Sequence, residues 1–262
     1  MKYYVLTILT VITLHFSGKT QTNSHITPAA ERMEQYLLLL KGKHVGVFAN
    51  PTSTIGNSHL VDTLRKLGVT ISVIFGPEHG FRGTADAGEK VGNYTDKETG
   101  IPVVSLYGSK TKPAKEDLQN VDILLFDIQD VGVRFYTYIS SLEGMIEAAI
   151  EFDKPLIILD RPNPNGHYVD GPVLDKKYQS FVGRQPVPVV YGMTIGEYAL
   201  MITKEQWLKP EWNKKGAQYN WYNQTNIKPK EFALKIILCK NYTHPSRNVL
   251  PVKPSRNLPN IQ

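Results

Sequence analysis

The sequence predicts an α/β fold in which helices cover both faces of a mostly parallel β-sheet. The chain has 262 residues, 41% of them hydrophobic and 21% charged, which is typical of a globular protein with a full core. Short apolar runs, several rich in β-branched residues, alternate with segments of helical spacing. Continuous apolar strands that alternate with helices indicate a parallel sheet buried on both faces.

The first half of the chain shows this alternation clearly. Residues 44–49 form an apolar run that predicts the first strand, and 59–67 carries apolar residues at helical spacing before Gly68, a common helix terminator. Residues 69–75 are rich in β-branched side chains and predict the second strand. Residues 102–106 predict the third strand.

The pattern continues toward the C-terminus. It predicts a short helix over 115–118, strands over 121–126, 156–159 and 232–238, and the longest helix over 136–152. A further helix is expected over 194–202, where Thr194 and Glu197 match a capping box.

The N-terminus has the pattern of a secretory signal. Lys2 precedes an apolar run over 3–16, and Ser17 and Gly18 follow it, so we expect a signal peptide over 1–21. The run is shorter than the roughly 20 apolar residues that span a bilayer, so no transmembrane segment is expected in the mature chain. The protein is therefore expected to be exported to the periplasm or the extracellular space.

Composition and motifs exclude several classes of function. The net charge of +6 is mild, and no basic run with interleaved aromatics indicates nucleic-acid binding. The sequence has no dinucleotide fingerprint, Walker loop or serine-hydrolase elbow, so no cofactor is expected. Cys239 is the single cysteine and no paired histidine motif occurs, so no metal site is expected either.

Ligands of parallel α/β sheets bind beyond the carboxyl ends of the strands. Four polar segments rich in glycine or proline follow predicted strands and are expected to carry the chemistry: 50–53, 76–83, 127–134 and 160–166.

Glu78 is the first candidate for a general acid. It follows a buried strand, and Gly76, Gly80 and Gly83 allow the backbone to approach a ligand closely. A carboxyl at an apolar strand end is favoured to keep its proton, as a general acid requires. The alternative is a loop carboxylate that pairs with Arg82 or caps a helix.

The segment after the most apolar strand offers Asp127, Gln129, Asp130 and Arg134. Asp127 and Gln129 point the same way if the strand continues, because side chains alternate along a strand. The guanidinium of Arg134 suits a carboxylate or an amide. The alternative is an Asp130–Arg134 salt bridge that only shapes the loop.

A third polar loop carries Asp160, Arg161 and Asn163. Pro162 and Pro164 stiffen this loop, which would hold hydrogen-bonding groups in place at low entropic cost. The alternative is turn formation, because asparagine next to proline or glycine favours turns in any case.

Tyr136 and Tyr138 lie at the entry of the longest predicted helix. Either hydroxyl can hydrogen-bond a sugar, and the alternative is that both rings serve packing.

Several of these motifs together resemble a known family, the bacterial exo-β-N-acetylmuramidases. The resemblance runs from about Gly42 to the last residue. It is carried by the segments 75–83, 87–89, 126–138, 159–166, 168–172, 192–197 and 240–243.

The resemblance implies a Rossmann-like catalytic domain, which we place at 40–190. It also implies a smaller α+β C-terminal domain that begins within 191–262, with the active site in the cleft between the two. Family chains continue beyond this point, so the second domain is expected to be truncated. Two departures are the insertion-like stretch 207–229 and Arg256, where the family has a proline.

The family implies release of N-acetylmuramic acid from the non-reducing ends of peptidoglycan fragments, with Glu78 as the catalytic acid. The alternative is a non-catalytic cell-wall glycan-binding protein or an inactive truncated paralogue. Candidates for a second catalytic group are Asp127, Asp130, Glu89, Asp160 and the N-acetyl group of the substrate itself. An arginine is expected to bind the lactyl carboxylate, and the candidates are Arg82, Arg134 and Arg161. Tyr107, Tyr136 and Tyr138 are candidates for stacking on sugar faces. The remaining expected substrate contacts are His79, Gln129, Asp160 and Asn163.

Overall fold

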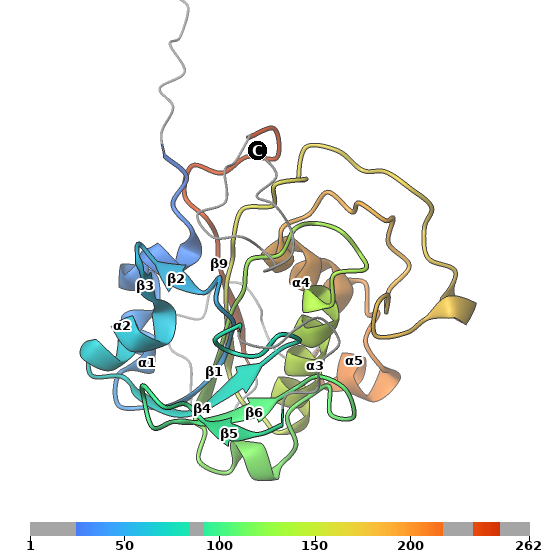
Figure 1. Ribbon diagram of the computed structural model, residues 1–262. Coiled ribbons are helices and arrows are strands. Elements are labelled where there is room, and N and C mark those ends of the chain that lie inside the picture. Colours follow the sequence, from blue (N-terminus) through green and yellow to red (C-terminus); the bar gives the residue numbers. More distant parts are fainter. Residues whose placement is uncertain (1–24, 84–91, 217–232, 247–262) are drawn as a thin grey trace, which may run out of the picture.

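The computed structural model of the chain describes residues 25–83, 92–216 and 233–246. These residues form a three-layer α/β structure (Figure 1). The helices α1 (Leu37–Leu40) and α2 (Leu60–Lys66) cover one face of the sheet. The helices α3 (Tyr138–Glu151), α4 (Ile195–Lys204) and α5 (Pro210–Gly216) lie on the other face.

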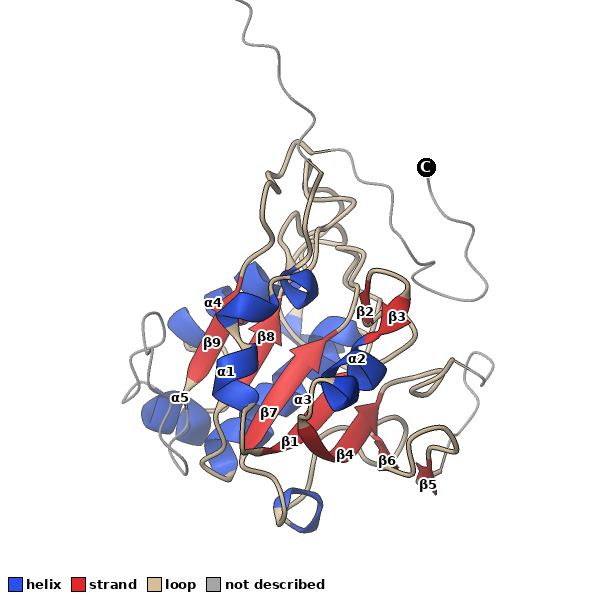
Figure 2. Cartoon of the chain, turned by 90° about the vertical axis from the view of Figure 1, so that its left-hand side faces the viewer, coloured by secondary structure: helices blue, strands red, loops and turns tan. Residues whose placement is uncertain are grey.

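Seven strands of the described residues form one sheet in the order β5-β6-β4-β1-β7-β8-β9 (Figure 2). All neighbours are parallel except the edge strand β5. Leaving out β5, the strands run 3-2-1-4-5-6 in chain order, which is the Rossmann order. The predicted doubly wound, Rossmann-like α/β class is therefore confirmed.

The strands of this sheet are β1 (His44–Ala49), β4 (Thr70–Gly76), β5 (Tyr94–Thr95), β6 (Pro102–Ser105), β7 (Ile123–Asp127), β8 (Leu156–Leu159) and β9 (Leu234–Ile237). A separate hairpin pairs β2 (Thr54–Ile55) with β3 (Ser58–His59). Four short 3-10 helices complete the described elements: η1 (Ala29–Glu31), η2 (Met33–Gln35), η3 (Glu116–Leu118) and η4 (Lys176–Tyr178).

Side chains of each central strand alternate between two separate hydrophobic cores. In β7, Leu124 and Phe126 pack into the core beneath α3 and α4, whereas Ile123 and Leu125 pack into the core beneath α1 and α2. On the α3 side, the ring of Phe126 stacks on that of Phe48 with centroids 4.7 Å apart. This alternation decides which face receives each polar side chain that follows a strand.

Helix α3 is the central helix of its layer. Every residue from Tyr138 to Ile150 is buried, including Glu143, whose carboxylate accepts hydrogen bonds from Tyr198 and Gln185. These bonds tie α3 to α4 and to the segment before it. The predicted capping box at the start of α4 is present, with Thr194 and Glu197 as its two partners.

The chain after residue 190 differs from the predicted division into two domains. Helix α4 packs against α3, and β9 pairs in parallel with β8. The described residues after 190 therefore belong to the same sheet and helix layer as the residues before them. Strand β9 pairs with the outer edge of β8. The hairpin β2-β3 and the edge strand β5 were not predicted.

The predicted signal over 1–21, Glu89 and most of the aromatic stretch 207–229 lie outside the described residues. Within the described part of the chain, no helix is both long and apolar enough to cross a bilayer.

Candidate active site

The carboxyl ends of β1 and β7 meet at the point where the strand order of the sheet reverses. Ala49 pairs with Asp127 at the last position of the two strands. The loop after β1 is fixed there by its side chains, because Ser53 Oγ donates to the Asp127 carbonyl at 2.6 Å and Thr52 Oγ1 accepts from the Gln129 amide at 2.9 Å. Ligands of this fold bind beside such a point.

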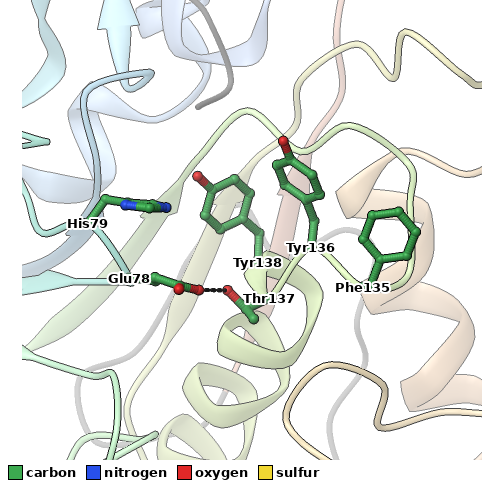
Figure 3. A pocket seen from close by; sticks show the side chains of 6 residues that line it. All are labelled: Glu78, His79, Phe135, Tyr136, Thr137 and Tyr138. Atoms are coloured by element: carbon green, nitrogen blue, oxygen red, sulfur yellow. Dashed lines mark hydrogen bonds between the residues drawn. The ribbon is translucent and has the colours of Figure 1, made fainter. Parts of the chain in front are cut away.

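A pocket of about 170 Å³ opens at this edge of the sheet. It lies between the loop after β4 and the segment that enters α3, and Figure 3 shows Glu78 and His79 on one side and Phe135 on the other. The residues that line it are Glu78, His79, Phe135, Tyr136, Thr137 and Tyr138.

The backbone after β4 is bent so that Glu78 reaches this pocket. His79 has a φ of 69° and Gly80 has a φ of 77°, both in the left-handed region that turns the chain sharply. The Glu78 side chain is half-buried, and its Oε2 accepts a long hydrogen bond of 3.4 Å from Thr137 Oγ1 (Figure 3). Thr137 is the N-cap of α3 but makes no capping bond with its side chain, so its hydroxyl faces Glu78.

Two tyrosines form the wall between Glu78 and Phe135. The rings of Tyr136 and Tyr138 meet edge to face with centroids 5.8 Å apart. Asn50, from the loop after β1, donates to the Tyr138 hydroxyl at 3.2 Å. Burial raises the pKa of both phenols, so both stay protonated hydrogen-bond donors near neutral pH.

Asp130 is a buried carboxyl close to this wall. Its Oδ2 accepts hydrogen bonds from the Gly132 amide at 2.7 Å and from the Tyr191 hydroxyl. Its Oδ1 is buried and has no hydrogen-bond partner among the described residues. Burial raises the pKa of Asp130 to about 6, against the effect of these two donors. The charge of Asp130 also contributes to the raised pKa values of Tyr136 and Tyr138.

Asp127 and Arg161 form an ion pair on the face of the sheet that α1 and α2 cover. Arg161 Nε and Nη2 donate to the two carboxylate oxygens of Asp127 at 2.6 and 2.8 Å, and Nη2 also donates to the Thr54 carbonyl. Both side chains are at most 1% exposed. The predicted catalytic role of Asp127 and the predicted substrate contact of Arg161 do not fit this geometry, because each group is sealed by the other.

Asp160 points to the face of the sheet that α3 and α4 cover, where it accepts hydrogen bonds from the start of α4. Its oxygens accept hydrogen bonds from Thr194 Oγ1 and from the Gly196 amide, each at 2.9 Å. Burial raises the pKa of Asp160 to about 7. The predicted substrate contact of Asp160 is therefore replaced by a structural one.

The amides of Gln129 and Asn163 join neighbouring loops. Gln129 Nε2 donates to the carbonyls of Asp130 and Pro162, each at 2.7 Å, and Asn163 Nδ2 donates to the Met193 carbonyl at 2.7 Å. Both side chains are buried, so neither makes the predicted substrate contact in this geometry.

Two other predicted arginines are also engaged within the protein. Arg82 pairs with Asp62 at 3.1 Å, with Asp96 at 3.0 Å and with Glu98 at 3.2 Å. Arg134 Nη1 donates to the carbonyls of Pro172 and Val187 and so fixes the long segment before α4. The alternative Asp130–Arg134 salt bridge is not formed, since Arg134 turns toward these carbonyls.

Comparison with known proteins assigns the chain to a family. The family model described as "Exo-beta-N-acetylmuramidase NamZ, N-terminal" matches residues 45–262. The chain belongs to the NamZ family. The resemblance inferred from the motifs is thus confirmed.

Individual relatives agree with this assignment. The peptidoglycan beta-N-acetylmuramidase NamZ of Bacillus subtilis (strain 168) is 49% identical over 178 residues, which are 66% of this chain and 42% of that protein. Two crystal structures of DUF1343 family proteins from Bacteroides fragilis NCTC 9343 share the fold. One has a TM-score of 0.75 at 43% identity, covering 90% of this chain and 58% of its own. The other has a TM-score of 0.70 at 35% identity, covering 84% of this chain and 52% of its own. The chain thus spans about half the length of the relatives that it matches.

Four of the candidate residues named from the sequence line one pocket of this NamZ-family chain: Glu78, His79, Tyr136 and Tyr138. Phe135 and Thr137 were missed, although the sequence held a signal for them. In a Rossmann fold the helix that follows a strand begins at the ligand-binding edge, so residues just before the longest helix belong to the site. No cluster of three or more metal-ligating side chains occurs among the residues that the structure describes.

Proposed function

We propose that this chain acts as an exo-acting glycoside hydrolase that releases N-acetylmuramic acid from the non-reducing ends of peptidoglycan fragments. Membership of the NamZ family supports the reaction class. The observation that carries the proposal is the placement of Glu78 in a pocket opposite the exposed ring of Phe135. A carboxyl that faces an aromatic ring suits a pyranose, whose apolar face stacks on the ring while its oxygens meet polar groups.

In the proposed reaction, Glu78 gives a proton to the glycosidic oxygen as the bond to the anomeric carbon breaks. Thr137 and the turn at His79 hold the carboxyl in place for this transfer. The phenols of Tyr136 and Tyr138 are donors for hydroxyl or carbonyl oxygens of the bound sugar. Among the candidates that the structure describes, we assign the second carboxyl to Asp130, because its Oδ1 has no hydrogen-bond partner in the described part of the chain, whereas both oxygens of Asp127 and of Asp160 accept hydrogen bonds.

The lactyl carboxylate of muramic acid needs a donor on the pocket wall. Arg82, Arg134 and Arg161 are not among the residues that line this pocket. His79 lines the pocket beside Glu78 and carries a ring N–H, so we assign the lactyl contact to His79. This contact would distinguish N-acetylmuramic acid from N-acetylglucosamine, which lacks the lactyl group.

Export is part of the proposal, because peptidoglycan fragments are met outside the cytoplasm. The apolar run over 3–16 supports an exported, periplasmic or extracellular location.

The direct test uses two chromogenic substrates, a 4-nitrophenyl N-acetyl-β-muramide and its N-acetylglucosamine counterpart. We expect release of nitrophenol from the muramide and little from the counterpart. Binding of muropeptides without any hydrolysis would contradict the proposal and favour a glycan-binding protein.

A further inference from the structure

The register between β4 and β6 places Tyr107 next to Glu78. Strands β4 and β6 are parallel, and Gly76 pairs with Ser105 at their carboxyl ends. The Leu106 amide donates to the Gly76 carbonyl at 2.9 Å, which continues this pairing beyond the strands. Residues two positions further on, Glu78 and Tyr107, therefore leave the sheet side by side.

The Tyr107 side chain contacts the Glu78 carboxyl. A hydrogen bond to Glu78, burial and the charge of that carboxylate together raise the pKa of Tyr107. Near neutral pH the phenol stays protonated and donates a hydrogen bond to the carboxylate. Thr137 approaches Oε2 of Glu78 from the segment before α3, so donors from two different loops converge on this one carboxyl.

The ring of Tyr107 is supported from the long segment before α4. The centroid of the Phe181 ring lies 6.4 Å from that of Tyr107, with the planes tilted by 56°. The Arg184 guanidinium lies over the other ring, with its carbon 5.8 Å from the Phe181 centroid. Because an aromatic contact limits rotation of the phenol, the Tyr107 hydroxyl is kept near Glu78.

We infer that Tyr107 is a positioning residue, which orients the Glu78 carboxyl by a hydrogen bond. This inference rests on the proposed role of Glu78 as general acid, and it replaces the earlier expectation that Tyr107 stacks on a sugar face. A hydrogen bond that holds the acid in its reactive orientation acts on the chemical step more than on substrate binding. Loss of the hydroxyl should therefore lower kcat more than it changes KM.

The kinetic test compares the wild type with Tyr107→Phe, which removes only the hydroxyl. We expect kcat for the muramide to fall about tenfold, while KM changes less than about twofold. Phe181→Leu keeps the hydroxyl but loosens the ring, and it should produce a smaller loss of kcat. Tyr94→Phe is the matched control, since burial and Asp96 raise the pKa of Tyr94 without Glu78. A kcat of Tyr107→Phe that equals that of the wild type would overturn the inference.

A second readout needs no activity. In protein labelled with ¹³C at tyrosine Cζ, the Tyr107 signal is assigned from its absence in Tyr107→Phe and then titrated in wild type and in Glu78→Gln. We expect the Tyr107 phenol to titrate at lower pH in Glu78→Gln, with the Tyr94 signal unchanged. A Tyr107 signal that titrates at the same pH in Glu78→Gln as in the wild type refutes the contact. A shift of that signal in a protein that hydrolyses no muramide would leave the contact standing and refute the proposed function instead.

Discussion

The ends of β4 and β7 carry similar polar residues but use them in different ways. Glu78, two residues after β4, is half-buried and lines an open pocket. Asp127, the last residue of β7, is fully buried and bonded through both oxygens to Arg161. The loop after β4 turns at two left-handed residues and leaves the sheet, whereas Asp127 still follows the alternation of its strand and faces a core. Glu78 is thus available for chemistry because it lies in a turn beyond the strand, closed by the hydrogen bond from the Gly80 amide to the Pro77 carbonyl at 2.9 Å, whereas Asp127 still belongs to its strand.

The largest expected effect concerns the buried pair. Arg161→Leu leaves the Asp127 carboxylate without its partner in the core, which typically costs about 3–5 kcal/mol of the free energy of unfolding. Urea denaturation followed by circular dichroism measures this loss. The matched control is Lys177→Ala, which breaks the exposed pair with Asp175 and should cost less than about 1 kcal/mol. Equal effects of the two variants would show that Asp127 and Arg161 are not sealed from solvent.

These contrasts show how much the sequence could predict. The alternation of strands and helices was sufficient for the α/β class and for placing Glu78 at a strand end. It could not show that Arg161 leaves β8 on the same face as Asp127, because that depends on the register Asp127↔Leu159 between strands far apart in the sequence. It likewise could not show that Asp160 meets the start of α4, since no local pattern links the two. The pocket position of Phe135 follows only when the start of α3 is known.

On the pocket side, the His79 imidazole is the group expected to determine selectivity. His79→Asn removes the imidazole but keeps the left-handed backbone, which asparagine tolerates. If His79 binds the lactyl carboxylate, the preference for N-acetylmuramic acid over N-acetylglucosamine should fall about tenfold, equivalent to about 1.4 kcal/mol. Titration calorimetry with the two free sugars measures the ratio of Kd values. An unchanged ratio would assign the lactyl contact to another residue.

A smaller effect is expected in the pH dependence of stability. Burial raises the pKa of folded Asp160 to about 7, well above that of an unfolded aspartate. The folded state therefore binds more protons between about pH 4 and pH 7, and the free energy of unfolding should fall as pH rises through this range. Asp130 contributes with the same sign.

Asp160→Asn should flatten this decline, because the asparagine oxygen can still accept from the Gly196 amide without ionising. Denaturation at a series of pH values measures the slope, with Asp175→Asn as the exposed control. A slope that stays the same in Asp160→Asn would contradict the assigned titration.

The central claim is that the carboxyl of Glu78 supplies the proton, and Glu78→Gln tests it most directly. The amide keeps the size of the side chain but has no acidic proton to give, so hydrolysis of the 4-nitrophenyl muramide should fall by about 10²–10⁴-fold. The thermal midpoint should stay close to that of the wild type, because Glu78 lines a pocket and lies outside both cores. Turnover close to that of the wild type in a folded Glu78→Gln protein would contradict the account.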